Sequence, residues 1–220
     1  MTNTRNLNDA TVLVVGAGIM GAGIAQTAAQ AGHPVLLFDM RKGAAVAAKD
    51  KLATTFDSLV TKGRIAADAA QAALRRITAV DTLDDAAAAR LVVEAIVENL
   101  DAKRALFKQL EALLPADAVL ATNTSSISVT AIAGGLQHPG RLVGMHFFNP
   151  VPLMKLVEVV SGLETDADVA AAIFELSKAW GKTPVHAKST PGFIVNRIAR
   201  PYYAETMALL LESGQDHAPT

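Results

Sequence analysis

The sequence predicts an α/β fold in which helices cover both faces of a largely parallel sheet. Short apolar runs alternate with helical stretches along most of the 220 residues, a pattern that favours parallel strands joined by right-handed helical crossovers. A glycine-rich turn joins the first predicted strand to the first predicted helix, and an acidic residue closes the second strand. These observations together are typical of a doubly wound, Rossmann-type domain.

The predicted elements follow from the spacing of the apolar residues. Strands are expected at residues 11–15, 35–39, 77–79, 91–95, 119–122, 142–146 and 184–187, with a further candidate at 153–160. Helices are expected near 20–31, 42–62, 101–113 and 166–180. The region 42–76 is predicted to form two helices, broken at Gly63, that project as a hairpin. A last helix is expected from Phe193 to about Leu211, kinked or interrupted by Pro201.

Composition narrows the classes of function. The chain is 51% hydrophobic and 19% charged, as in ordinary globular proteins. A net charge of −1 gives no general attraction to nucleic acid or to an anionic membrane. The absence of cysteine excludes disulfides and thiolate chemistry. Residues 10–38 lack charged side chains but contain five glycines, which makes a poor membrane span, and we expect a soluble, cytoplasmic protein.

The glycine-rich turn has the spacing of a dinucleotide-binding motif. Gly16 allows a tight turn, Gly18 allows backbone to approach a pyrophosphate, and Gly21 allows the helix to pack closely on the strand. The first helical residues, Ile19 and Met20, belong to an N-terminus whose backbone N–H groups favour phosphate. The motif therefore predicts NAD binding, against the alternative of a tight turn without a ligand.

Asp39 lies 23 positions after Gly16, near the offset of about 20 expected for a carboxylate that binds the adenosine ribose. It favours NAD over NADP, because its charge repels a 2′-phosphate. Arg41 and Lys42 follow closely and weaken that preference.

A histidine and a glutamate are predicted to face each other near the end of the sheet. Pro152 lies midway between His146 and Glu158, so antiparallel pairing about that centre places the two side chains opposite each other. Glu158 shares a strand face with apolar residues, so we expect it to be buried and to need a partner. Such a pair makes the imidazole a competent general base for alcohol oxidation. The alternative is an ordinary buried polar pair.

Polar side chains are expected beside this pair. Ser125, Asn149 and Asn196 carry hydroxyl and amide donors that suit a substrate oxygen gaining negative charge. The alternatives are that Ser125 and Ser126 cap a helix and that Asn196 bonds only backbone. No metal-like cluster of His, Asp and Glu is apparent. The remaining histidines are interpreted as solvated or structural: His33, His138, His186 and His217.

Taken together, these motifs resemble those of the L-3-hydroxyacyl-CoA dehydrogenases, and most closely the bacterial 3-hydroxybutyryl-CoA and phenylacetate-pathway branch. The resemblance covers nearly all of the chain and rests on residues 16–23, 94–99, 123–126, 146–150, 154–158 and 191–197. It implies reversible, NAD-dependent oxidation of an L-3-hydroxyacyl-CoA to the 3-ketoacyl-CoA. A related 3-hydroxy-acid dehydrogenase with a catalytic lysine, and an NAD-binding sensor or crystallin-like protein without turnover, are the alternatives.

The resemblance also implies a role for each site residue. His146 is the base and Glu158 orients it, while Ser125 and Asn196 contact the substrate. The remaining assignments place Asn149, Glu98 and Lys103 near the nicotinamide and its ribose, and Lys62 against the CoA portion.

The same resemblance implies two domains. Residues 1–189 are expected to form the NAD-binding domain, and 190–220 the first helix of an all-α C-terminal domain that dimerises in full-length members. In full-length members that domain closes over the cleft, and only its first helix is expected here. We therefore expect this chain to bind NADH but to turn over acetoacetyl-CoA slowly. A homodimer is expected for the full-length family, and the state of this chain is left open.

Overall fold

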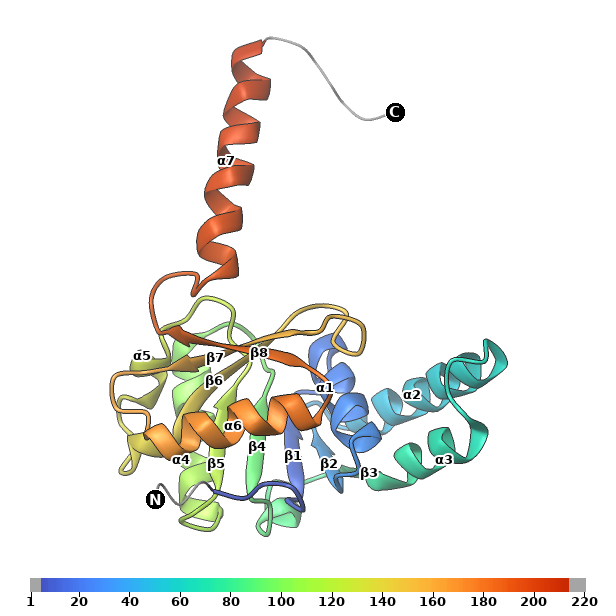
Figure 1. Ribbon diagram of the computed structural model, residues 1–220. Coiled ribbons are helices and arrows are strands. Elements are labelled where there is room, and N and C mark those ends of the chain that lie inside the picture. Colours follow the sequence, from blue (N-terminus) through green and yellow to red (C-terminus); the bar gives the residue numbers. More distant parts are fainter. Residues whose placement is uncertain (1–4, 214–220) are drawn as a thin grey trace.

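The computed structural model describes residues 5–213, and its elements alternate between strands and helices (Figure 1). The strands are β1 (Val12–Val15), β2 (Val35–Phe38), β3 (Ile77–Val80), β4 (Leu91–Glu94), β5 (Val119–Thr122), β6 (Leu142–Phe147), β7 (Leu156–Ser161) and β8 (Thr183–Lys188). The α-helices are α1 (Ile19–Gln30), α2 (Ala44–Thr61), α3 (Ala67–Arg76), α4 (Leu100–Leu113), α5 (Val129–Ala133), α6 (Ala167–Ala179) and α7 (Val195–Ser213), with 3₁₀ turns η1 (Asp84–Ala86) and η2 (Pro139–Arg141).

The described strands form one eight-stranded sheet in the order β3-β2-β1-β4-β5-β6-β7-β8. Every neighbouring pair is parallel except β6 and β7, which are antiparallel. The chain order reverses between β1 and β4, and this reversal is the point where dinucleotides bind in doubly wound folds. The expected α/β, mostly parallel architecture is confirmed.

Helices cover the sheet on two faces because the strands are apolar on both. On one face, residues such as Val12 and Val14 pack with Ile24 of α1. On the other, Leu13 and its neighbours pack with Phe107 of α4. Two hydrophobic layers therefore hold the strand ends, and the loops that follow them, in fixed positions.

The helical hairpin is formed by α2 and α3, which extend beyond the β3 edge of the sheet (Figure 1). Gly63 breaks it in a left-handed conformation, with φ of 64°, which glycine adopts without strain. Leu52 and Phe56 of α2 are buried against the sheet. The predicted projecting hairpin is thus present, and buried side chains of α2 anchor it to the sheet.

The segment between β6 and β7 begins as a turn, so the strand candidate at 153–160 starts only at Leu156. The Pro150 carbonyl accepts hydrogen bonds from the N–H groups of Leu153 and Met154. These bonds curl the chain before the return strand can pair.

The last helix, α7, rises away from the sheet (Figure 1) and is one helix through Pro201. The predicted interruption at Pro201 is wrong, because a proline in the second turn removes one backbone hydrogen bond and the helix continues past it. The alternative, that Pro201 kinks the helix, stays a prediction. The division into domains at 189/190 stays a prediction, and residues 214–220, with His217, lie outside the described residues. Within 5–213, no helix has the length and apolar character needed to cross a membrane.

Candidate active site

The glycine-rich turn lies at the carboxyl end of β1, beside β4. A Cβ atom on Gly21 would lie 1.7 Å from the Gly16 carbonyl oxygen, and one on Gly16 would lie 2.5 Å from that of Ala95. Both glycines are therefore required by close backbone contacts. A Cβ on Gly18 would meet nothing within 4 Å. Gly18 is thus the one of the three whose open side is free to receive a ligand.

Asp39 follows β2 and turns back to the glycine-rich turn. Its carboxylate accepts hydrogen bonds from the N–H of Ala17 at 2.8 Å and from the N–H and side chain of Arg41. Burial alone raises the pKa of Asp39, but the bonds from Arg41 and Ala17 outweigh it and hold that pKa below the ordinary value. Asp39 is thus kept ionised next to the turn.

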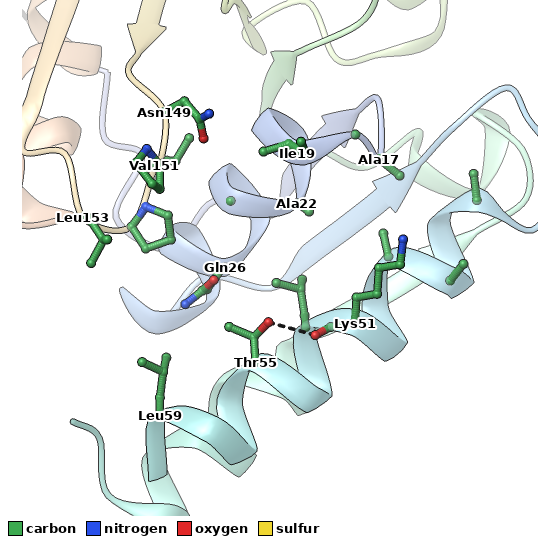
Figure 2. A pocket seen from close by; sticks show the side chains of 18 of the residues that line it. Ala17, Ile19, Ala22, Gln26, Lys51, Thr55, Leu59, Asn149, Val151 and Leu153 are labelled. Carbon is green, nitrogen blue, oxygen red and sulfur yellow. Dashed lines mark hydrogen bonds between the residues drawn. The ribbon is translucent and has the colours of Figure 1, made fainter. Parts of the chain in front are cut away.

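A groove of about 710 Å³ runs from the glycine-rich turn along α2. Figure 2 shows Lys51, Thr55 and Leu59 of α2 facing Asn149, Val151 and Leu153 of the β6–β7 loop, with Ile19, Ala22 and Gln26 of α1 between them. The groove has the size of a small-molecule site. Ile19 is exposed in it, whereas Met20 packs against the core.

Lys62, predicted to contact CoA, lies in the turn that follows α2 and is exposed. It is absent from the groove lining, where Lys51, about three helical turns earlier, supplies the cation of α2. Lys51 carries no motif of its own, so sequence reasoning missed it.

His146 and Glu158 lie directly opposite each other on β6 and β7. The Nδ1 atom of His146 is 2.6 Å from Oε2 of Glu158, and the residues are 5% and 0% exposed. The rings of Phe148 and Phe193 flank the imidazole. The predicted antiparallel pairing and the predicted contact are both present.

Glu158 also holds the start of the last helix. Its Oε1 accepts hydrogen bonds from the N–H groups of Ile194 and Val195 at 2.9 and 3.0 Å. A carboxylate at a helix N-terminus satisfies otherwise unpaired donors and favours the helix dipole. This second role of Glu158 joins residues 36 positions apart, a separation that carries no sequence signal.

Ser125 and Asn196 are brought together, as predicted. The Asn196 side-chain amide donates to the Ser125 carbonyl oxygen at 3.2 Å, so within the described residues its partner is backbone, as the alternative held. Neither Ser125 nor Ser126 caps the following helix. The cap of α5 is Ser128, whose side chain accepts from the N–H of Ala131.

Glu98 binds the same loop from the other side. Its Oε1 accepts from the Thr124 hydroxyl at 2.5 Å and from the Ser125 N–H at 3.0 Å. Burial alone raises the pKa of Glu98, but the Thr124 hydroxyl and the Lys103 charge outweigh it and lower that pKa. Lys103 reaches Glu98 at 3.3 Å and is almost fully buried, whereas Asn149 is exposed at the far wall of the groove.

The other described histidines are structural or solvated, as predicted. His33 is buried, with Nδ1 3.0 Å from the Ala10 carbonyl oxygen. His186 stacks on Phe174, and His138 is exposed. Across residues 5–213, no group of three or more His, Cys, Asp or Glu is placed to hold a metal ion.

Comparison with known proteins identifies the chain's relatives. Residues 11–190 match the family model for the 3-hydroxyacyl-CoA dehydrogenase NAD-binding domain. The chain is 51% identical to the 3-hydroxyadipyl-CoA dehydrogenase of Escherichia coli over 94% of its length, and 41% identical to the probable 3-hydroxybutyryl-CoA dehydrogenase of Bacillus subtilis over 91%. It spans 43% of the first relative's length and 70% of the second's.

Solved structures agree with this match. The (S)-3-hydroxybutyryl-CoA dehydrogenase from Ralstonia eutropha superposes with a TM-score of 0.91 at 40% identity, covering 95% of this chain and 74% of that one. The chain therefore belongs to the 3-hydroxyacyl-CoA dehydrogenase family, and its residues 11–190 match the NAD-binding domain of that family.

Proposed function

We propose that the protein carrying this chain catalyses the reversible, NAD-dependent oxidation of an L-3-hydroxyacyl-CoA to the 3-ketoacyl-CoA. The observation that carries the proposal is the buried pair of His146 and Glu158, 2.6 Å apart, at the sheet edge that also bears the glycine-rich turn. A general base near a hydride-transfer cofactor is what alcohol oxidation requires.

The cofactor fits the residues present. Gly18 leaves open space where the pyrophosphate approaches. Asp39 is held ionised beside the glycine-rich turn, where its carboxylate accepts a hydrogen bond from the Ala17 N–H. We assign the cradle to Gly16, Gly18, Ile19, Met20 and Gly21. NAD, when bound, supplies the hydride acceptor. The charge on Asp39 supports NAD over NADP, although Arg41 lies against it.

The protein's own residues handle the proton. His146 Nε2 accepts the proton of the substrate 3-hydroxyl as the C3 hydride departs, and it returns that proton in the reverse direction. Glu158 accepts the Nδ1 hydrogen bond, which fixes the tautomer and stabilises the imidazolium. Ser125 and Asn196 are proposed to bind the substrate oxygen that gains charge.

The remaining site residues are proposed to bind NAD and the phosphates of CoA. Glu98, Lys103 and Asn149 are assigned to the nicotinamide side of the crevice. Lys62 and Lys51 are assigned to the CoA phosphates, since both are exposed cations on or next to α2, which walls the groove.

The test is to follow NADH oxidation by the intact protein with acetoacetyl-CoA, and with free acetoacetate as the matched control. The proposal predicts turnover of the CoA ester and little turnover of the free acid. Equal use of the free acid favours a related 3-hydroxy-acid dehydrogenase. Tight NADH binding without any turnover favours an NAD-binding protein that is not an enzyme.

A cytoplasmic location and a homodimer of the full-length protein are also proposed. The absence of cysteine fits a reducing compartment. Light scattering on the intact protein measures the oligomeric state.

Slow turnover by the isolated 220-residue chain stays a prediction, which the NADH oxidation assay with acetoacetyl-CoA tests.

A further inference from the structure

Glu94 is a fully buried carboxylate to which the proposed mechanism gives no role. It ends β4 and is 0% exposed. Its oxygens accept hydrogen bonds from the Ile96 N–H at 2.7 Å, the Thr122 hydroxyl at 2.6 Å and the Lys103 ammonium at 2.5 Å. A buried carboxylate is tolerated when donors surround it in this way.

Lys103 links this carboxylate to the site. Lys103 is 1% exposed and lies in the first turn of α4. The Asn99 side chain caps this helix by accepting a hydrogen bond from the Ala102 N–H. The Lys103 ammonium lies between Glu94 and Glu98 Oε2, at 2.5 and 3.3 Å. A charged network therefore runs from the β4 end to the loop that Glu98 holds through the Ser125 N–H.

The network sits at the reversal of strand order. Glu94 pairs in register with Val15, the last residue of β1, and the Ala95 carbonyl touches the Gly16 position. A dinucleotide at this point brings two phosphate charges. Without the Lys103 ammonium, the charges of Glu94 and Glu98 would be uncompensated near this point, and such charges repel an anion strongly where water is excluded.

We propose that Glu94 is a positioning residue, which holds the Lys103 ammonium beside Glu98 at the carboxyl end of β4 and so sustains NAD(H) affinity. The inference rests on the NAD-binding part of the proposed function. Glu94 touches neither substrate nor cofactor, and it acts through Lys103. Without this anchor, the Lys103 side chain has rotamer freedom to move away from Glu98.

A double-mutant cycle on NADH affinity tests the inference. Fluorescence titration gives the dissociation constant of NADH for Lys103→Met, Glu94→Gln and the double variant. We expect each single variant to weaken NADH binding about tenfold, which corresponds to about 1.4 kcal/mol. The double variant should be no weaker than Lys103→Met, because Glu94 has nothing left to position.

The inference is overturned if the two losses multiply, as they do for independent sites, or if Glu94→Gln binds NADH like the unaltered protein. A purely structural role for Glu94 predicts that its effect persists without Lys103. Should Glu94→Gln fail to fold, Glu94→Asp takes its place in the cycle, with the same two outcomes deciding. The double variant keeps the pair's net charge unchanged.

The matched control is Glu111→Gln. Glu111 also accepts two hydrogen bonds, from the N–H groups of Gln137 and His138, but lies in the last turn of α4. The NADH affinity of the Glu111→Gln variant should be unchanged. The titration uses no acyl-CoA, so it is independent of the proposed reaction. If the NADH affinities show that Glu94 and Lys103 are coupled but the protein does not turn over acetoacetyl-CoA, only the proposed reaction is contradicted. If turnover is normal but the two losses of NADH affinity are independent, only this inference is contradicted.

Discussion

Replacing Glu158 by Gln removes a charge from a fully buried group that has three hydrogen-bond donors. The donors are His146 Nδ1 and the N–H groups of Ile194 and Val195. A hydrogen bond to a charged group contributes about 1.5–3 kcal/mol, and a neutral one about 0.5–1.5 kcal/mol. The variant also turns a donating NH₂ group toward one of these donors.

The structure therefore predicts two separate losses. The free energy of unfolding should fall by about 2–4 kcal/mol, since up to three charged bonds become neutral or are lost. For a chain of this size each kcal/mol lowers Tm by roughly 2–4 °C. Loss of imidazolium stabilisation should lower kcat about 10- to 100-fold, at about 1.4 kcal/mol for each factor of ten.

Two measurements on the folded variant separate these losses. Acetoacetyl-CoA-dependent NADH oxidation gives kcat, and fluorescence titration gives the NADH dissociation constant. That constant should change less than about twofold, because the partners of Glu158 are His146 and the start of α7. Glu164→Gln, the same change at an exposed residue just after β7, should behave like the unaltered protein. A folded Glu158→Gln variant with undiminished kcat would refute the reasoning.

Three further predictions test the cradle, the loop and the groove. Gly18→Ala should keep its Tm, because its Cβ meets no atom within 4 Å, yet bind NADH at least about tenfold more weakly; unchanged affinity would place the phosphates elsewhere. Glu98 has a lowered pKa, so its stabilisation is present above the ordinary value of 4.5 and is lost as pH falls through the lowered pKa. Urea unfolding should thus show the gap between the unaltered protein and Glu98→Gln closing in acid, and a gap that widens there would contradict the sign. Lys51→Ala should raise KM for acetoacetyl-CoA about threefold or more with kcat kept, whereas Lys108→Ala on α4 should not.

The parts of the site that could be predicted share a local signal. Gly16 and Gly21 are required by backbone contacts that any strand–turn–helix of this spacing makes. His146 and Glu158 are equidistant from Pro152, so a reversal there pairs them whatever the rest of the fold does. The alternation of strands and helices followed from the same local periodicity.

The parts that could not be predicted depend on contacts distant in sequence. The pair of Glu94 and Lys103 bridges a strand end and a helix turn, and either residue alone is typical of a solvated face. The bonds from Glu158 to the start of α7 likewise cross 36 positions. The interruption expected at Pro201 did not occur, because α7 tolerates the one hydrogen bond that the proline removes.

The proposed reaction depends above all on His146, which moves the proton at this site. The most direct test is the rate of acetoacetyl-CoA reduction by His146→Gln in the intact protein, measured at saturating NADH. We expect a loss of at least about 100-fold, the lower range for a general acid–base group, with NADH affinity retained. A variant that binds NADH and still reduces acetoacetyl-CoA at the original rate would contradict it.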